Sequence, residues 1–171
     1  PMALHEETGF SFSAEEVLEL VTPNTRLLIL NSPANPTGGA VPKEEMDKLV
    51  AGLNNHPHVV VLSDEIYDRM LYDGREHVSL LSYESIRERL VLLNGWSKTY
   101  AMTGWRMGYG VWPADLIEPA KRLSINCHSC VNAAAQWAGI AALEGPQNDV
   151  DKMVAAFDAR RRVIVRALNQ V

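Results

Sequence analysis

Cysteine is scarce in this chain, and long apolar runs are absent. The 171 residues include two cysteines, which is too few for the disulfide framework of a small secreted domain. No apolar stretch approaches the ~20 residues that a membrane-spanning helix needs, and we expect no membrane partner. Residues 1–7 lack a basic region followed by an apolar one, so we expect no secretory signal peptide. Together these absences favour a cytoplasmic setting.

A surplus of positive charge is also missing. The formal net charge is −5 at pH 7, whereas nucleic-acid binding rewards clustered lysine and arginine. The one basic cluster, Arg160 to Arg162, falls in a helical pattern, where we expect a solvated face. We therefore expect no nucleic-acid partner. With 47% apolar and 22% charged residues, the composition is that of an ordinary globular protein, and the length suffices for one domain with a sizeable core.

Helical and strand patterns alternate along the chain. Short runs that are apolar throughout predict buried strands, and apolar residues at helical spacing predict helices. The expected strands span residues 26–30, 59–62, 90–93 and 106–111, and the expected helices span residues 14–21, 43–53, 83–89, 113–123, 132–143 and 150–168. Apolar strands separated by helices indicate a three-layer α/β fold, with a mainly parallel sheet and helices on both faces.

Lys98 lies in the most informative segment, NGWSKTYAMTGWRMGY, which spans residues 94–109. An apolar run at 90–93 delivers this lysine onto a turn rich in Gly, Ser and Thr, and Arg106 follows eight residues later. A lysine in such a place can form an imine with a carbonyl cofactor, and an arginine can hold a phosphate.

Three segments in this order resemble the class I and II aminotransferases, which are fold type I enzymes that use pyridoxal phosphate. They are NSPANPTGG at 31–39, SDEIY at 63–67, and the lysine segment at 94–109. Each motif alone is weak evidence, but all three together are a strong signal. The resemblance implies that pyridoxal 5'-phosphate is the cofactor. It also implies that an amino group is transferred between an L-amino acid and a 2-oxo acid.

The resemblance assigns two residues to the reactive end of the cofactor. Lys98 would form the imine and, once freed by substrate, move the proton between the substrate α-carbon and the cofactor. Asp64 would pair with the ring nitrogen of the cofactor, because a carboxylate at the end of an apolar strand needs a partner. Glu65 is the rival acid, but Asp64 matches the motif position.

Two further residues are implied as donors to the phenolic oxygen of the cofactor. Tyr67 would donate from one side and Asn35 from the other, which stabilises the phenolate. In the family the peptide bond before Pro36 is often cis, and X–Pro bonds permit that form at low cost.

Arg106 is implied as the phosphate ligand, since its planar fork suits pairs of oxygen atoms. Ser97 or Thr99 would add a hydroxyl group, with Ser97 the weaker candidate because adjacent side chains on an extended segment point apart. Many family members have Ser or Thr three residues before the lysine, where this chain has Gly95. Gly95 therefore offers no hydroxyl for a phosphate contact from that position.

By its extent, the resemblance covers only a middle section of the family's chain. Residues 1–149 correspond to part of the cofactor-binding large domain, and residues 150–171 to the start of the long helix that leads to a small domain. We therefore expect a piece of a longer protein. Family members are homodimers with the active site at the subunit boundary, so the resemblance implies a homodimer.

Two other functions remain open at this stage. The same fold hosts β-lyases that act on sulfur-bearing amino acids with the same cofactor residues, and fold alone does not decide the reaction. The other is an aminotransferase-like ligand-sensing domain of a transcription regulator. The sequence does not identify the amino acid or the keto acid.

Cys127 and Cys130 form a C-x-x-C pattern. A structural zinc site usually takes four ligands, and this chain has no second pair at suitable spacing, so we expect no metal site. We interpret the two cysteines as small loop or helix-start residues.

Overall fold

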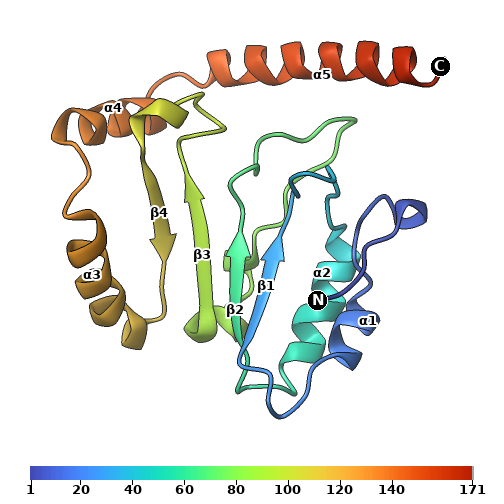
Figure 1. Ribbon diagram of the computed structural model, residues 1–171, viewed down its shortest axis with the longest axis vertical. Helices are drawn as coiled ribbons and strands as arrows, with labels where there is room; N and C mark the ends of the chain where they lie inside the picture. Colours follow the sequence, from blue (N-terminus) through green and yellow to red (C-terminus); the bar gives the residue numbers. More distant parts are fainter. Residues whose placement is uncertain (171) are drawn as a thin grey trace.

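A four-stranded sheet forms the centre of the computed structural model, which describes residues 1–170 (Figure 1). Its strands are β1 (Leu27–Asn31), β2 (Val60–Asp64), β3 (Leu90–Gly95) and β4 (Gly108–Val111), in that spatial order. β1, β2 and β3 are parallel, whereas β4 is antiparallel to β3. The predicted α/β class with a mainly parallel sheet is confirmed.

Five α-helices accompany the sheet in the described residues: α1 (Ala14–Glu19), α2 (Lys43–Leu53), α3 (Ala114–His128), α4 (Ala133–Glu144) and α5 (Asn148–Leu168). Four 3-10 helices, η1 (Glu6–Thr8), η2 (Leu80–Ser82), η3 (Glu84–Arg89) and η4 (Thr103–Trp105), lie in the connections. None of the helices within residues 1–170 combines the length and apolar character that a membrane crossing requires.

Most predicted elements match the structure to within two residues at each end, and the helix expected at 83–89 is the 3-10 helix η3. Two of the differences have a local cause. The helix expected to end at residue 123 continues to His128, because the chain first takes a left-handed conformation at Ser129, where φ is 65°. The strand expected from residue 106 begins at Gly108, because Arg106 itself has a φ of 57° and cannot lie in a ladder.

The core lies between the sheet and the first two helices (Figure 1). The predicted apolar face of α2 is buried, and its members are Met46, Leu49, Val50 and Leu53. Each such side chain stabilises the fold by roughly 1.5–3 kcal/mol. Helices α3 and α4 lie beside β4, and α5 runs across the edge where the parallel strands end. The face of β1 that bears Ile29 is not covered by any of the described residues, since Ile29 is 63% exposed.

Several ion pairs connect helix α5 to the rest of the chain. Arg161 pairs with Asp73 at 2.8 Å and with Asp158, and Arg162 pairs with the same two carboxylates. The Arg161 guanidinium also lies 4.8 Å from the centre of the Tyr72 ring. The expected basic cluster is thus partly neutralised by aspartates, and the ion pairs tie α5 to the loop that follows β2.

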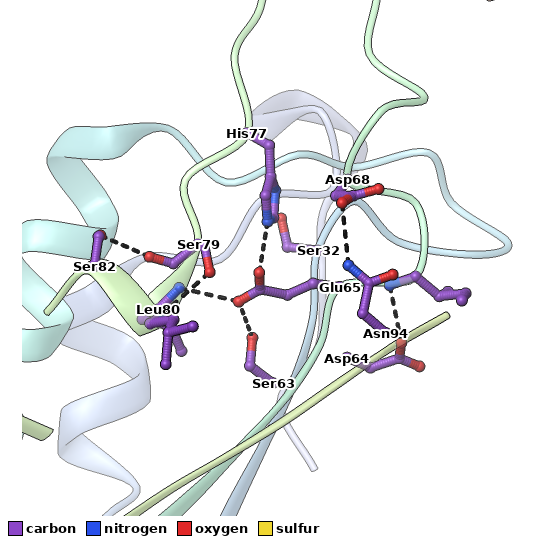
Figure 2. A network of polar contacts seen from close by, with 12 residues as sticks. Ser32, Ser63, Asp64, Glu65, Asp68, His77, Ser79, Leu80, Ser82 and Asn94 are labelled. Carbon is purple, nitrogen blue, oxygen red and sulfur yellow. Dashed lines mark hydrogen bonds and ion pairs between the residues drawn. The ribbon is translucent and has the colours of Figure 1, made fainter. Parts of the chain in front are cut away.

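A buried carboxylate organises the loop after β2 (Figure 2). Glu65 is 2% exposed. Its Oε1 accepts hydrogen bonds from Ser63 Oγ (2.8 Å) and from the amide of Leu80 (3.0 Å), and its Oε2 accepts one from His77 Nε2 (2.8 Å). Burial alone would raise the pKa of Glu65, but hydrogen bonds from His77, Ser79, Leu80 and Ser63 together lower it below its ordinary 4.5. The network fixes the loop that leaves β2 and returns at η2.

Gly95 closes β3 where β4 approaches most closely. A Cβ at this position would lie 2.9 Å from both Gly108 Cα and Met107 O, which are backbone atoms of the neighbouring segment. This contact explains why a Ser or Thr side chain has no room here.

The Glu65 network predicts acid sensitivity. Because its pKa is lower in the folded state, the stabilisation is complete above the ordinary pKa and is lost as the pH falls through the folded one. Glu65→Gln should lower the free energy of unfolding by ~1–3 kcal/mol at neutral pH and flatten its dependence below about pH 4.5. Urea unfolding followed by circular dichroism at several pH values measures both. The exposed control Glu88→Gln should change neither, and an acid slope equal to wild type in Glu65→Gln would contradict this account.

The close approach at Gly95 predicts a steric effect. Gly95→Ser should lower the free energy of unfolding by about 1–3 kcal/mol, because the backbone of β4 must shift to admit a Cβ. Gly104→Ser is the matched control, since a Cβ there meets nothing within 4 Å. Equal unfolding midpoints for the two variants in urea would show that the sheet accommodates the side chain.

Candidate active site

Lys98 projects from the loop that follows β3. Its side chain is half-buried, and its Nζ lies 5.4 Å from the centre of the Tyr67 ring. Within residues 1–170, Nζ has no hydrogen-bond or ion-pair partner. A half-buried amine that is left unpaired, with an aromatic face beside it, is available for chemistry with a ligand.

Tyr67 and Asn35 lie together at the same edge of the sheet. Asn35 Nδ2 donates to the Tyr67 hydroxyl at 3.3 Å, and the Asn35 amide donates to Asn31 Oδ1 at 3.1 Å. The end of β1 therefore orients Asn35, and Asn35 orients the phenol. The peptide bonds before Pro33 and Pro36 are both cis.

A cavity of about 490 Å³ opens beside Lys98. Tyr67 and Ser97 line it together with Lys98, and Met153 and Phe157 of α5 contribute from the other side. The predicted residues Tyr67, Ser97 and Lys98 thus share one space, and Asn35 joins them through its hydrogen bond to Tyr67.

Asp64 ends β2, where its register partners are Asn31 on β1 and Leu93 on β3. The side chain is half-buried, and Oδ1 accepts a hydrogen bond from the amide of Ile66 at 3.2 Å. The rival acid Glu65 is fully engaged in its own network (Figure 2). Of the two adjacent acids, Asp64 is therefore the one with hydrogen-bonding capacity to spare.

Arg106 does not line the cavity of Lys98. Its guanidinium is exposed, with Nη1 donating to Thr103 O at 3.0 Å, and it forms no ion pair within residues 1–170. It faces a second cavity, of about 980 Å³, between η4 and the ends of α3 and α4. The two cavities share one lining residue, Ala101.

The hydroxyl candidates beside Lys98 differ in their surroundings. The Ser97 side chain faces the cavity of Lys98, whereas Thr99 is 4% exposed and its hydroxyl donates to Asp68 Oδ1 at 2.9 Å. The hydroxyl proton of Thr99 is therefore engaged by a part-buried carboxylate, and Ser97 is the freer of the two predicted phosphate donors. Sequence reasoning missed Asp68, whose only signal was a third acid in residues 64–68.

Cys127 and Cys130 are both exposed and unbridged. Cys127 belongs to the last turn of α3, and Cys130 lies in the loop before α4, where it lines the cavity that Arg106 faces. No cluster of three or more His, Cys, Asp or Glu side chains among residues 1–170 is arranged to hold a metal ion.

Comparisons with known proteins identify the family. The family model for aminotransferase class I and II matches residues 1–171. The chain is 37% identical to an aspartate aminotransferase of Rhizobium meliloti over 99% of its length and 42% of that protein. It is 34% identical to aromatic-amino-acid aminotransferase 2 of Thermococcus litoralis over 98% of its length and 43% of that protein.

The fold comparison leads to the same group. The crystal structure of the aspartate aminotransferase from Rhizobium meliloti superimposes with a TM-score of 0.95 at 36% identity, covering 99% of this chain and 43% of that one. The predicted three-layer α/β architecture is thus the fold type I architecture of its structural relatives. The chain spans about two fifths of the length of the relatives it matches. It belongs to the class I and II aminotransferase family.

Proposed function

We propose that the protein to which this chain belongs is a pyridoxal-phosphate-dependent aminotransferase that transfers an amino group between an L-amino acid and a 2-oxo acid. The observation that carries the proposal is the unpaired amine of Lys98, which shares a cavity with Tyr67 at the carboxyl edge of a parallel sheet. The names of the relatives, aspartate and aromatic-amino-acid aminotransferases, support transamination over β-elimination or ligand sensing.

The donor set fits pyridoxal phosphate. Lys98 offers a free amine for the aldehyde carbon, and Asp64 offers a carboxylate oxygen to hold the proton of the ring nitrogen. Arg106 offers a guanidinium without an ion-pair partner in the described residues. When bound, the cofactor supplies an electron sink for the charge that develops on the substrate α-carbon.

The hydrogen bond from Asn35 orients the hydroxyl group of Tyr67. Because Asn35 Nδ2 donates to the Tyr67 oxygen, the phenolic hydrogen remains free to be donated to an acceptor in the site. Tyr67 would donate it to the phenolic oxygen of the cofactor, with Asn35 as the second donor. Ser97 is the hydroxyl that remains for the phosphate, since Thr99 is engaged.

Proton movement is assigned to Lys98. Lys98 Nζ would act as the base that takes up and carries the proton of the substrate α-carbon. The positions of Tyr67, Met153 and Phe157 around the amine partly shield this path from water.

The remaining parts of the proposal concern the whole protein. Residues 1–149 would belong to its cofactor-binding domain, and residues 150–171 would begin the helix that leads to a small domain. We further propose a homodimer in the cytoplasm, with amino acids and 2-oxo acids as substrates.

Covalent attachment at Lys98 is the first test. The purified chain mixed with pyridoxal phosphate should develop a visible absorbance band of protein-bound cofactor, and borohydride should fix one cofactor on the peptide that contains Lys98. Lys98→Ala should abolish both signals. Lys121→Ala removes an exposed lysine of α3, 64% accessible, and should preserve them. A band of equal strength in Lys98→Ala would overturn the assignment.

Phosphate recognition by Arg106 is the second test. Arg106→Ala should weaken binding of pyridoxal phosphate by about tenfold or more, because a hydrogen bond to a charged group is lost. Pyridoxal, which lacks the phosphate, should bind wild type and variant alike, and Arg122→Ala on α3 should affect neither ligand. If titrations show the same loss for both ligands, Arg106 does not contact the phosphate.

A further inference from the structure

Asp68 connects the loop that follows β2 to the loop that follows β3. Its Oδ1 accepts a hydrogen bond from Thr99 Oγ1 at 2.9 Å. Its Oδ2 accepts one from Asn94 Nδ2 at 3.0 Å (Figure 2). Hydrogen bonds to an ionised carboxylate are stronger than those between neutral groups. One carboxylate therefore holds the beginning and the end of the short segment 94–99, which contains Lys98.

Both partners of Asp68 are themselves held in place. The Asn94 amide group is fixed at its other end, because Asn94 Oδ1 accepts from the Gly95 amide at 2.7 Å. Thr99 is 4% exposed, so its hydroxyl has little access to water as an alternative hydrogen-bond partner. On the other loop, the Asp68 amide donates to Glu65 O at 3.0 Å, which joins Asp68 to the buried network. The three residues of the clamp, Asp68, Asn94 and Thr99, are thus each held by further hydrogen bonds or by burial.

Two residues of the clamp are next to predicted site residues in the sequence. Tyr67 precedes Asp68, and Lys98 precedes Thr99. We propose that Asp68 is a positioning residue that fixes Lys98 against the Tyr67 ring by bridging Thr99 and Asn94. It acts through the backbone and touches neither the cofactor nor the substrate. The positioning of Lys98 by Asp68 does not depend on the proposed function. Only the consequence for cofactor attachment rests on the proposed role of Lys98.

The test measures Lys98 itself, without cofactor. Competitive labelling with a trace of acetic anhydride reports the reactivity of every lysine in one sample. Lys43, Lys48, Lys121 and Lys152, whose side chains are 64–76% exposed, serve as internal references. Release of the clamp should free Lys98 from the Tyr67 ring and raise its labelling rate by about tenfold, the change expected for one lost hydrogen bond to a charged group. The reference rates should stay constant.

The variants separate positioning from charge. Asp68→Asn removes the carboxylate, whereas Thr99→Val removes one hydrogen bond and leaves the charge of Asp68 in place. Thr99→Ser keeps the hydroxyl and should restore the wild-type rate. Asp115→Asn, an exposed carboxylate at the start of α3, is the matched control. Faster labelling of Lys98 in both Asp68→Asn and Thr99→Val, with rescue by Thr99→Ser, supports the proposal.

Other outcomes overturn it. A change in Asp68→Asn alone would show that charge acts and position does not, and unchanged Lys98 labelling in both variants would show that the clamp has no effect. If Asp68→Asn unfolds, as judged by circular dichroism, the milder Thr99→Val decides the matter. The cofactor experiment is read separately: absence of a Lys98-dependent band in wild type refutes the proposed function, while the labelling result still decides the role of Asp68.

Discussion

The parallel register of β1, β2 and β3 is the constraint on which the site depends. Asn31, Asp64 and Leu93 are register partners, so the three strands end side by side and their following loops leave from one edge. Asn35, Tyr67 and Lys98 each lie three or four residues beyond a strand end. A slip of one residue in β2 would turn Asp64 to the opposite face. The apolar strands that form this ladder are therefore as important to the site as its polar side chains.

The segment 64–68 divides its side chains between ligand and scaffold. In the proposed function Asp64 and Tyr67 would contact the cofactor, while Glu65 and Asp68 accept hydrogen bonds from the protein itself. Both scaffold carboxylates accept hydrogen bonds from other loops, so the residues between them are held from two directions. Preorganisation of this kind reduces the entropy lost when a reacting group is brought into place. It is achieved here by acids that have no direct part in the chemistry.

Local patterns predicted local structure well. The buried face of α2 followed from helical spacing, and the parallel strands followed from their unbroken apolar runs. What escaped prediction depends on contacts between distant residues. The partners of Asp68 are 26 and 31 residues away, so no local pattern marks Thr99 as an interior donor. The separate cavity of Arg106 likewise depends on how α3 and α4 pack beside η4. The roles of Lys98, Asp64 and Tyr67 came from the family motif, since an isolated lysine on a loop has no special pattern.

The weak attachment of α5 has a mechanical consequence. Val150 is buried near the start of this 21-residue helix, and Asp151 beside it pairs with Arg69 at 3.5 Å. Farther along, the ion pairs of Arg161 and Arg162 with Asp73 connect the helix to the loop after β2, and their strength falls as salt is added. The helix is about 31 Å long, so a tilt of about 10° around Val150 displaces its far end by about 5 Å. Met153 and Phe157, which line the cavity of Lys98, lie on this helix and would move with it. The width of the cavity is thus coupled to the angle of α5, and through surface charges to the ionic strength of the surroundings.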